Sequence, residues 1–182
     1  MASAIIRTLV STRFALTKRE KADRKIRDEL RLYLEIADAL DPEVGAREVE
    51  VPSMLGVDDD MRRWSFFMIL EHNVIVNRRV TSAIKRLAND EPPAEDAKYF
   101  DVKKDVMPSA SPGIEQVAAF RESVEEHLEK VAALPKLKGT ATSPHSIFGP
   151  FDAHKWHCMF GFHLEIHRKQ AEAVMRLLHD DN

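Results

Sequence analysis

The chain has 182 residues, of which 44% are hydrophobic and 31% charged, and its formal net charge is −3. We expect a single domain over residues 1–182 with a substantial core, since length and composition are ordinary for a globular protein. Acidic and basic residues are interspersed, which argues against nucleic acid or a membrane as a partner. With one cysteine, Cys158, no intrachain disulfide can form, and a reducing cytoplasm fits this composition. No apolar run is long enough to predict a transmembrane helix.

The first 19 residues are basic and contain no acidic residue. Organelle-targeting peptides share this composition. We expect instead that the segment packs onto the domain. The apolar side chains expected to make this contact are Ile5, Ile6, Leu9, Val10 and Phe14.

Apolar residues recur at helical spacing in four segments, which predicts four helices of about 22 to 28 residues. The first helix follows a capping pattern at Thr17 and Glu20 and ends before Asp41. The second is capped by the aspartates at 58–60 and runs to about Ala88. Two longer connections of the chain, 41–59 and 89–111, bracket this second helix.

The third predicted helix starts at Ser111-Pro112 and ends at Leu134, and the fourth opens with Asp152 as its cap. No segment reads as a convincing strand. The connection over 89–111 could span roughly 75 Å, against about 40 Å for such a helix, so the second and third helices can run parallel. The sequence therefore predicts an all-α four-helix bundle with a long crossover between helices 2 and 3.

The second predicted helix is apolar around its whole circumference, so both of its faces need a cover. One face is expected to point into the bundle, and a second subunit or the N-terminal segment would cover the other. We favour a homodimer through this helix. The inward set is Met68, His72, Ile75, Val76 and Ala83, and the other set is Phe66, Leu70 and Val74.

His163, His167 and Gln170 share one face of the fourth helix with apolar residues. Unpartnered polar groups in an apolar interior cost roughly 1–3 kcal/mol each, so these three need partners. Histidines at i and i+4 on a helix can both bind one metal ion, although core histidines with hydrogen-bond partners remain the alternative. His72, on the inward face of the second helix, is the expected third ligand. Three neutral imidazoles leave an open position on the ion, which is typical of a catalytic site.

Other polar residues were assigned by their position around the helices. Ser65 and Arg79 project within about 20° of His72. A buried Arg79 would pair with Glu29 or Asp60, or would bind an anionic substrate. Three further histidines are expected at the surface, and they are His127, His154 and His157.

The sequence lacks the motifs of several other kinds of active site that occur in enzymes. No histidine follows a glutamate at the spacing of di-iron carboxylate proteins. The His-Glu-x-x-His, Gly-x-Ser-x-Gly and phosphate-binding glycine motifs are also missing from the sequence. Haem bound by two histidines stays open, although three inward histidines suit a small ion better.

Motifs spread along the chain resemble the DinB/YfiT-like superfamily of metalloenzymes. They are Trp64-Ser65, Leu70-Glu71-His72, His145-Ser146-Ile147-Phe148-Gly149, Trp156 and His163-x-x-x-His167-x-x-Gln170. The resemblance implies an up-down-down-up four-helix bundle whose metal is held by His72, His163 and His167. It also implies activities such as thiol-dependent transfer or isomerisation, with a low-molecular-weight thiol as cosubstrate, and homodimers.

We therefore expect one divalent metal ion (Zn, Ni or Fe) that activates a thiol or water against a small substrate, as in an S-transferase or a hydrolase. A metal-binding interaction or sensor protein without turnover and a plain structural bundle are the alternatives. The residues expected around the metal ligands are Ser65, Gln170, Trp64, Trp156, Phe160, Arg79 and His145.

Overall fold

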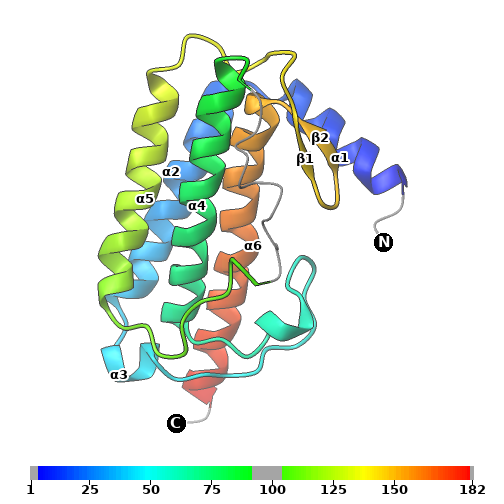
Figure 1. Cartoon of the computed structure of the whole chain (residues 1–182). Helices are drawn as coiled ribbons and strands as arrows, with labels where there is room; N and C mark the ends of the chain where they lie inside the picture. Colours follow the sequence, from blue (N-terminus) through cyan, green and yellow to red (C-terminus); the bar gives the residue numbers. More distant parts are fainter. Residues whose placement is uncertain (1–3, 92–103, 181–182) are drawn as a thin grey trace.

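The computed structural model describes residues 4–91 and 104–180, and four long helices form its body (Figure 1). They are α2 (Arg19–Asp38), α4 (Phe66–Ala88), α5 (Glu115–Ala132) and α6 (Ala153–Asp180). Helices α2 and α4 each pack against both α5 and α6, so α2 lies diagonally across the bundle from α4. This arrangement confirms the predicted four-helix bundle.

The helix directions confirm the predicted crossover. In Figure 1, α2 and α6 run downward while α4 and α5 both run upward, which gives the up-down-down-up order. The connection between α4 and α5 therefore returns along the length of the bundle. Residues 92–103 of this connection lie outside the described part. After them the chain lies beside α4, where the Ser109 backbone N–H donates to Glu71 Oε2 over 2.7 Å.

One face of α4 is covered differently from the expectation. Phe66, Leu70 and Val74 are buried within this single chain, since α4 packs on two neighbouring helices. The apolar cover that they need therefore comes from the bundle itself, and the argument for a second subunit at this face is wrong. Of the residues that were expected to face into the bundle, His72 is buried, and the others are only half-buried, namely Met68, Ile75, Val76 and Ala83. The homodimer itself stays a prediction.

Helix α4 starts later than we predicted from the aspartates at 58–60. Its N-cap is Ser65, whose Oγ accepts from the Met68 backbone N–H over 3.2 Å. The aspartates instead precede and enter a separate 3-10 turn, η1 (Asp59–Met61). A serine N-cap satisfies a backbone donor that the helix itself cannot pair. Its position next to Trp64 fixes where the chain enters the bundle.

Two other predicted caps are also wrong, and one is confirmed. Helix α2 has Lys18 at its N-cap without a side-chain bond, while the Thr17 hydroxyl donates to the Arg13 carbonyl. Helix α5 begins at Glu115 rather than at Ser111-Pro112. At the start of α6, Asp152 Oδ1 accepts from the Lys155 backbone N–H over 2.8 Å, as predicted.

A helix and a short hairpin lie together at one side of the bundle, beside the start of α6 (Figure 1). They are α1 (Ala4–Leu16) and the antiparallel strands β1 (Ser143–His145) and β2 (Gly149–Phe151). We call this part the arm. The sequence did not predict the strands, because each has only three residues and contains a proline. The remaining helix, α3 (Pro42–Gly45), is a single turn.

The arm packs onto α6 through one face of α1 and through the hairpin. Phe14 is buried against Phe151 and Phe162, as expected. By contrast, Ile5, Ile6 and Leu9 are 70%, 49% and 63% exposed, so the expected packing of these three is wrong. Over the described part of the chain, no helix is both long and apolar enough to cross a membrane.

Candidate metal centre

Three histidines from two helices meet in the interior between α4 and α6. His72 lies on α4, and His163 and His167 lie one turn apart on α6. The Nε2 atoms of His72 and His163 are 3.3 Å apart, and one nitrogen from each of the three rings lies within 4.8 Å of the others. Two nitrogens bound to the same tetrahedral ion at about 2.0–2.1 Å would be about 3.3 Å apart. The cluster could therefore hold a metal ion.

A backbone carbonyl fixes the orientation of the His72 ring. His72 Nδ1 lies 2.8 Å from the Val106 carbonyl oxygen, which can only accept a hydrogen bond. The ring proton of a neutral His72 is therefore on Nδ1, and the lone pair of Nε2 points toward His163. Val106 belongs to the chain that returns along α4, so the crossover supplies this contact.

The side-chain amide of Gln170 fixes the orientation of the His167 ring. His167 Nδ1 lies 2.8 Å from Gln170 Oε1, and Gln170 Nε2 donates to the Met61 carbonyl over 2.7 Å. The second bond fixes which end of the amide faces the histidine. His167 therefore donates through Nδ1 and keeps a lone pair on Nε2. Such outer contacts orient metal-binding histidines in proteins.

Burial keeps the three imidazoles neutral. It is the main cause that lowers the pKa of His72 to about 4 and of His167 to about 3, and it lowers the pKa of His163 well below its ordinary value. His163 Nδ1 is buried and has no hydrogen-bond partner among residues 4–91 and 104–180. Metal binding by histidine requires the neutral ring. At neutral pH this site therefore needs no proton release before a cation can bind.

Trp64 forms one wall of the site. Its ring lies 5.1 Å from that of His72 and is stacked, at an angle of 25°, 6.4 Å from that of His167. The neighbouring Ser65 is buried and caps α4. The structure thus places Trp64 and Gln170 against the histidines, while Ser65 lies next to Trp64 at the start of α4.

Two other aromatic residues expected at the site lie elsewhere. Phe160 stacks on His127, with ring centres 3.6 Å apart, in a different part of the core. Trp156 packs toward the arm, where its Nε1–H donates to Ser143 Oγ over 2.8 Å. Neither residue shows a ring contact with the three histidines.

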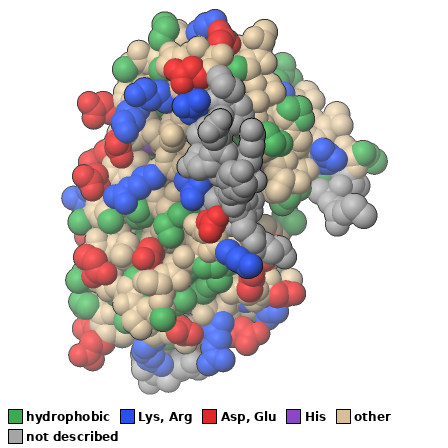
Figure 2. Space-filling model, viewed as in Figure 1, with side chains coloured by type: hydrophobic (Ala, Val, Ile, Leu, Met, Phe, Trp, Pro, Cys, Tyr) green, Lys and Arg blue, Asp and Glu red, His purple; other side chains and the backbone are tan. Residues whose placement is uncertain are grey.

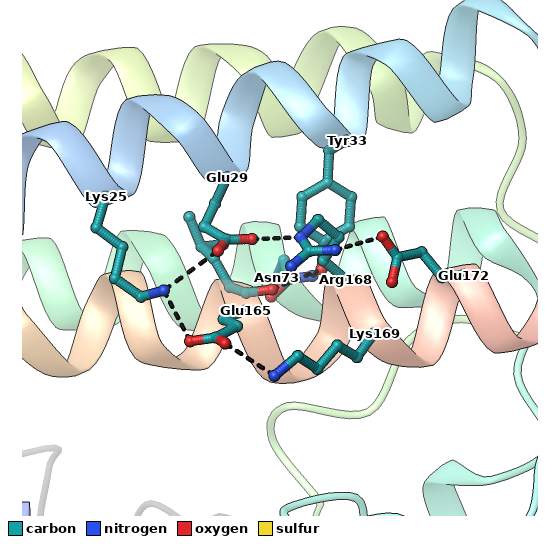
Figure 3. Close-up of polar contacts among 9 residues, drawn as sticks. Lys25, Glu29, Tyr33, Asn73, Glu165, Arg168, Lys169 and Glu172 are labelled. Carbon is teal, nitrogen blue, oxygen red and sulfur yellow. Dashed lines mark hydrogen bonds and ion pairs between the residues drawn. The ribbon is translucent and has the colours of Figure 1, made fainter.

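Arg79 is exposed at the surface, so the prediction of a buried arginine near His72 is wrong. The carboxylate of Glu29 pairs with Arg168 at 2.6 Å and with Lys25 at 3.2 Å instead (Figure 3). Figure 3 shows that the Glu29–Arg168 pair joins α2 to the helix that carries His163 and His167, whereas Lys25 and Glu29 lie on the same helix. Below them, the Tyr33 hydroxyl donates to the Leu164 carbonyl over 3.2 Å. The contacts fix α6 against α2.

His145 approaches the site from β1. Its Nδ1 accepts from the backbone N–H groups of Ile147 and Phe148 over 3.1 and 3.3 Å, so the ring proton of neutral His145 is on Nε2. The ring of His145 packs against those of Phe148 and Trp156, with ring centres 4.9 and 5.3 Å apart. Burial lowers the pKa of His145 to about 4.

A second group of histidines was missed. His127, His154 and His157 were expected at the surface, but each is at most 3% exposed. His127 Nε2 lies 3.0 Å from His157 Nδ1, and His157 Nε2 lies 3.1 Å from Asp23 Oδ1 without the alignment of a hydrogen bond. Helical position alone could not find this group, because Asp23 belongs to α2.

A family model described as the DinB superfamily matches residues 25–171, which include the three histidines, all of α4 and α6 as far as residue 171. Comparisons with curated proteins and with solved structures gave no match.

Proposed function

The chain belongs to the DinB superfamily, and we propose that it is a metal-dependent enzyme acting on a small substrate through His72, His163 and His167. The observation that carries this proposal is the meeting of three neutral imidazoles, of which His72 and His167 are buried and His163 is half-buried, with one nitrogen of each within 4.8 Å of the others. A bound divalent ion would lower the pKa of a thiol or a water molecule and so prepare a nucleophile. Transfer to a thiol, or hydrolysis, is the reaction class that we propose.

The residues around the histidines have separate tasks in this proposal. Val106 and Gln170 hold the rings of His72 and His167 so that both Nε2 atoms stay directed inward. The Trp64 ring excludes water from one side of the site. His145 carries its proton on Nε2 and is the candidate to donate a hydrogen bond from that N–H to a substrate.

The test is turnover by protein loaded with Zn, Ni or Fe. The loaded protein is incubated with a small electrophile and a low-molecular-weight thiol, and separately with an activated ester in the absence of thiol. We expect metal-dependent loss of thiol or release of product, abolished in His163→Ala and retained in His179→Ala, which changes an exposed histidine of the same helix. Tight binding of one ion without any turnover would favour the sensor or interaction protein instead.

A further inference from the structure

Helix α1 exposes an apolar stripe on the side that faces away from the bundle. Ile5, Leu9 and Leu16 are 70%, 63% and 78% exposed. At about 100° per residue they lie within about 40° of one another. The buried Phe14 lies on the opposite side. Four of the seven large hydrophobic side chains exposed in the described part of the chain belong to this 13-residue helix, so the exposure is concentrated there.

The charged residues of α1 and the two residues before Glu20 are all basic. Residues 1–19 contain four basic residues and no acidic one, so the rest of the chain carries a net charge of −7. Arg7, Arg13 and Lys18 are exposed. On the side of the molecule seen in Figure 2, the arm shows hydrophobic and basic side chains and no acidic ones. This charge favours a negatively charged partner.

Side chains of the bundle fix α1 in place by binding the end of this helix. The Lys138 ammonium donates to the Ala15 carbonyl over 2.9 Å, and His154 Nε2 lies 2.8 Å from the Thr17 carbonyl. Phe14 packs against Phe151 of β2, with ring centres 5.8 Å apart. The outward stripe is therefore presented on a docked helix.

A cleft between α1 and β2 adds hydrogen-bond donors on the side of α1 toward the hairpin. It has a volume of about 310 Å³ and is lined by Arg7, the hydroxyl residues Thr8, Ser11 and Thr12, and residues 148–150. No acidic side chain lines it. An arginine with hydroxyl groups is the donor set that suits a phosphate. Close by, Ile147 at the hairpin turn is 47% exposed.

We propose that the arm binds the surface of an anionic phospholipid membrane. The stripe on α1 would enter the boundary of the acyl chains, while Arg7, Arg13 and Lys18 would contact phosphate groups. A second copy of the chain fits less well, because a stable protein interface takes about 800 Å² from each partner and these few side chains offer only part of that. The proposal is independent of the metal site, and it departs from the expectation that no membrane takes part.

Sedimentation of the full chain with lipid vesicles tests this proposal. We expect the protein to bind vesicles of phosphatidylcholine with phosphatidylglycerol and not vesicles of phosphatidylcholine alone. Leu9→Gln should weaken binding about tenfold and Arg13→Gln about fivefold. The matched controls Leu55→Gln and Arg24→Gln change exposed residues outside the arm and should leave binding unchanged. Raising the salt concentration should weaken binding as well.

Three results would overturn the proposal. The first is equal binding to both kinds of vesicle or to neither. The second is the same loss for Leu55→Gln as for Leu9→Gln. The third is association of the protein with itself in the absence of lipid that Leu9→Gln abolishes, because the stripe would then be an interface between copies. Far-UV circular dichroism and thermal unfolding of each variant show whether it remains folded.

Discussion

The molecule contains two buried groups of histidines that differ in what their nitrogens face. In the group of His127 and His157, both nitrogens of each ring meet a protein atom. His127 Nδ1 lies 2.8 Å from Thr81 Oγ1, and since that hydroxyl already donates to the Asn77 carbonyl, it accepts from His127. The other nitrogens face each other or Asp23.

In the group of His72, His163 and His167, protein acceptors fix only one nitrogen of His72 and one of His167. One further nitrogen of each ring lies within 4.8 Å of the others, with the Nε2 atoms of His72 and His163 at 3.3 Å, while His163 Nδ1 has no partner in the described part of the chain. In the first kind of group each nitrogen has a protein atom beside it, although His157 Nε2 and Asp23 are not aligned as a hydrogen bond. In the second kind, the ring nitrogens that lie near one another would gain a common partner from a bound cation. Burial and spacing alone therefore do not distinguish a metal site from a group of core histidines.

The largest effect on folding is expected from a substitution in the group of His127 and His157. His157→Ala removes a fully buried ring and leaves His127 Nε2 without its neighbour, which should lower the free energy of unfolding by about 3 kcal/mol. Urea denaturation measures the change. The exposed control His179→Ala should stay within about 0.5 kcal/mol of wild type. If a folded His157→Ala variant lost metal binding, this would contradict the claim that the group of His127 and His157 takes no part in binding the metal.

A metal ion bound by His72, His163 and His167 should stabilise the folded protein. At about 100 times its dissociation constant, an ion that binds only the folded state raises the free energy of unfolding by about 2.7 kcal/mol. We expect this increase in wild type and in His157→Ala, and none in His167→Ala. Thermal unfolding with and without added Zn or Ni checks it. Equal stabilisation of His167→Ala would show that the ion binds elsewhere.

Loss of the support to one ring should have a smaller effect. Gln170→Ala removes the acceptor that orients His167, so we expect metal affinity to fall about 10- to 100-fold while binding persists. Competition with a chromogenic chelator measures the affinity. Gln116→Ala on α5, outside the site, is the control. If Gln170→Ala left the affinity unchanged, Gln170 would only be a buried polar residue.

The smallest effect concerns pH. Burial lowers the pKa of His157 from 6.5 to about 4, although Asp23 opposes the shift. The unfolded chain then binds more protons than the folded one between these values, so stability falls as the pH is lowered from about 6.5 toward 4. One such imidazole contributes at most about 1.4 kcal/mol per pH unit. His157→Gln should reduce the slope of unfolding free energy between pH 5 and 7, and an unchanged slope would contradict the assignment.

The sequence predicted the bundle because long amphipathic helices repeat a strong pattern. It also predicted the three histidines, because each lies on an apolar face whose partner face could be inferred. It could not predict the contacts of Val106 and Met61, since these are backbone carbonyls placed by loops. The group of His127 and His157 was not predicted, for a related reason. Its partners Asp23 and Thr81 lie on other helices, and no spacing along α6 indicates them.

The wrong predictions share a physical cause. Arg79 was placed near His72 by its angle around the helix, but it lies about two turns further along α4, where the side chain reaches solvent. Ile5 and Leu9 were expected to pack because they are apolar. Helix α1 contacts the bundle with only one face, and those residues are on the other.

Metal analysis of protein purified without a histidine tag, alongside His163→Ala and His179→Ala, tests the central claim most directly. After incubation with Zn, Ni or Fe and removal of the excess, we predict about one ion per chain in wild type and in His179→Ala, and close to none in His163→Ala. A wild type that binds none of these ions, or a His163→Ala variant that still holds one, would contradict the metal centre.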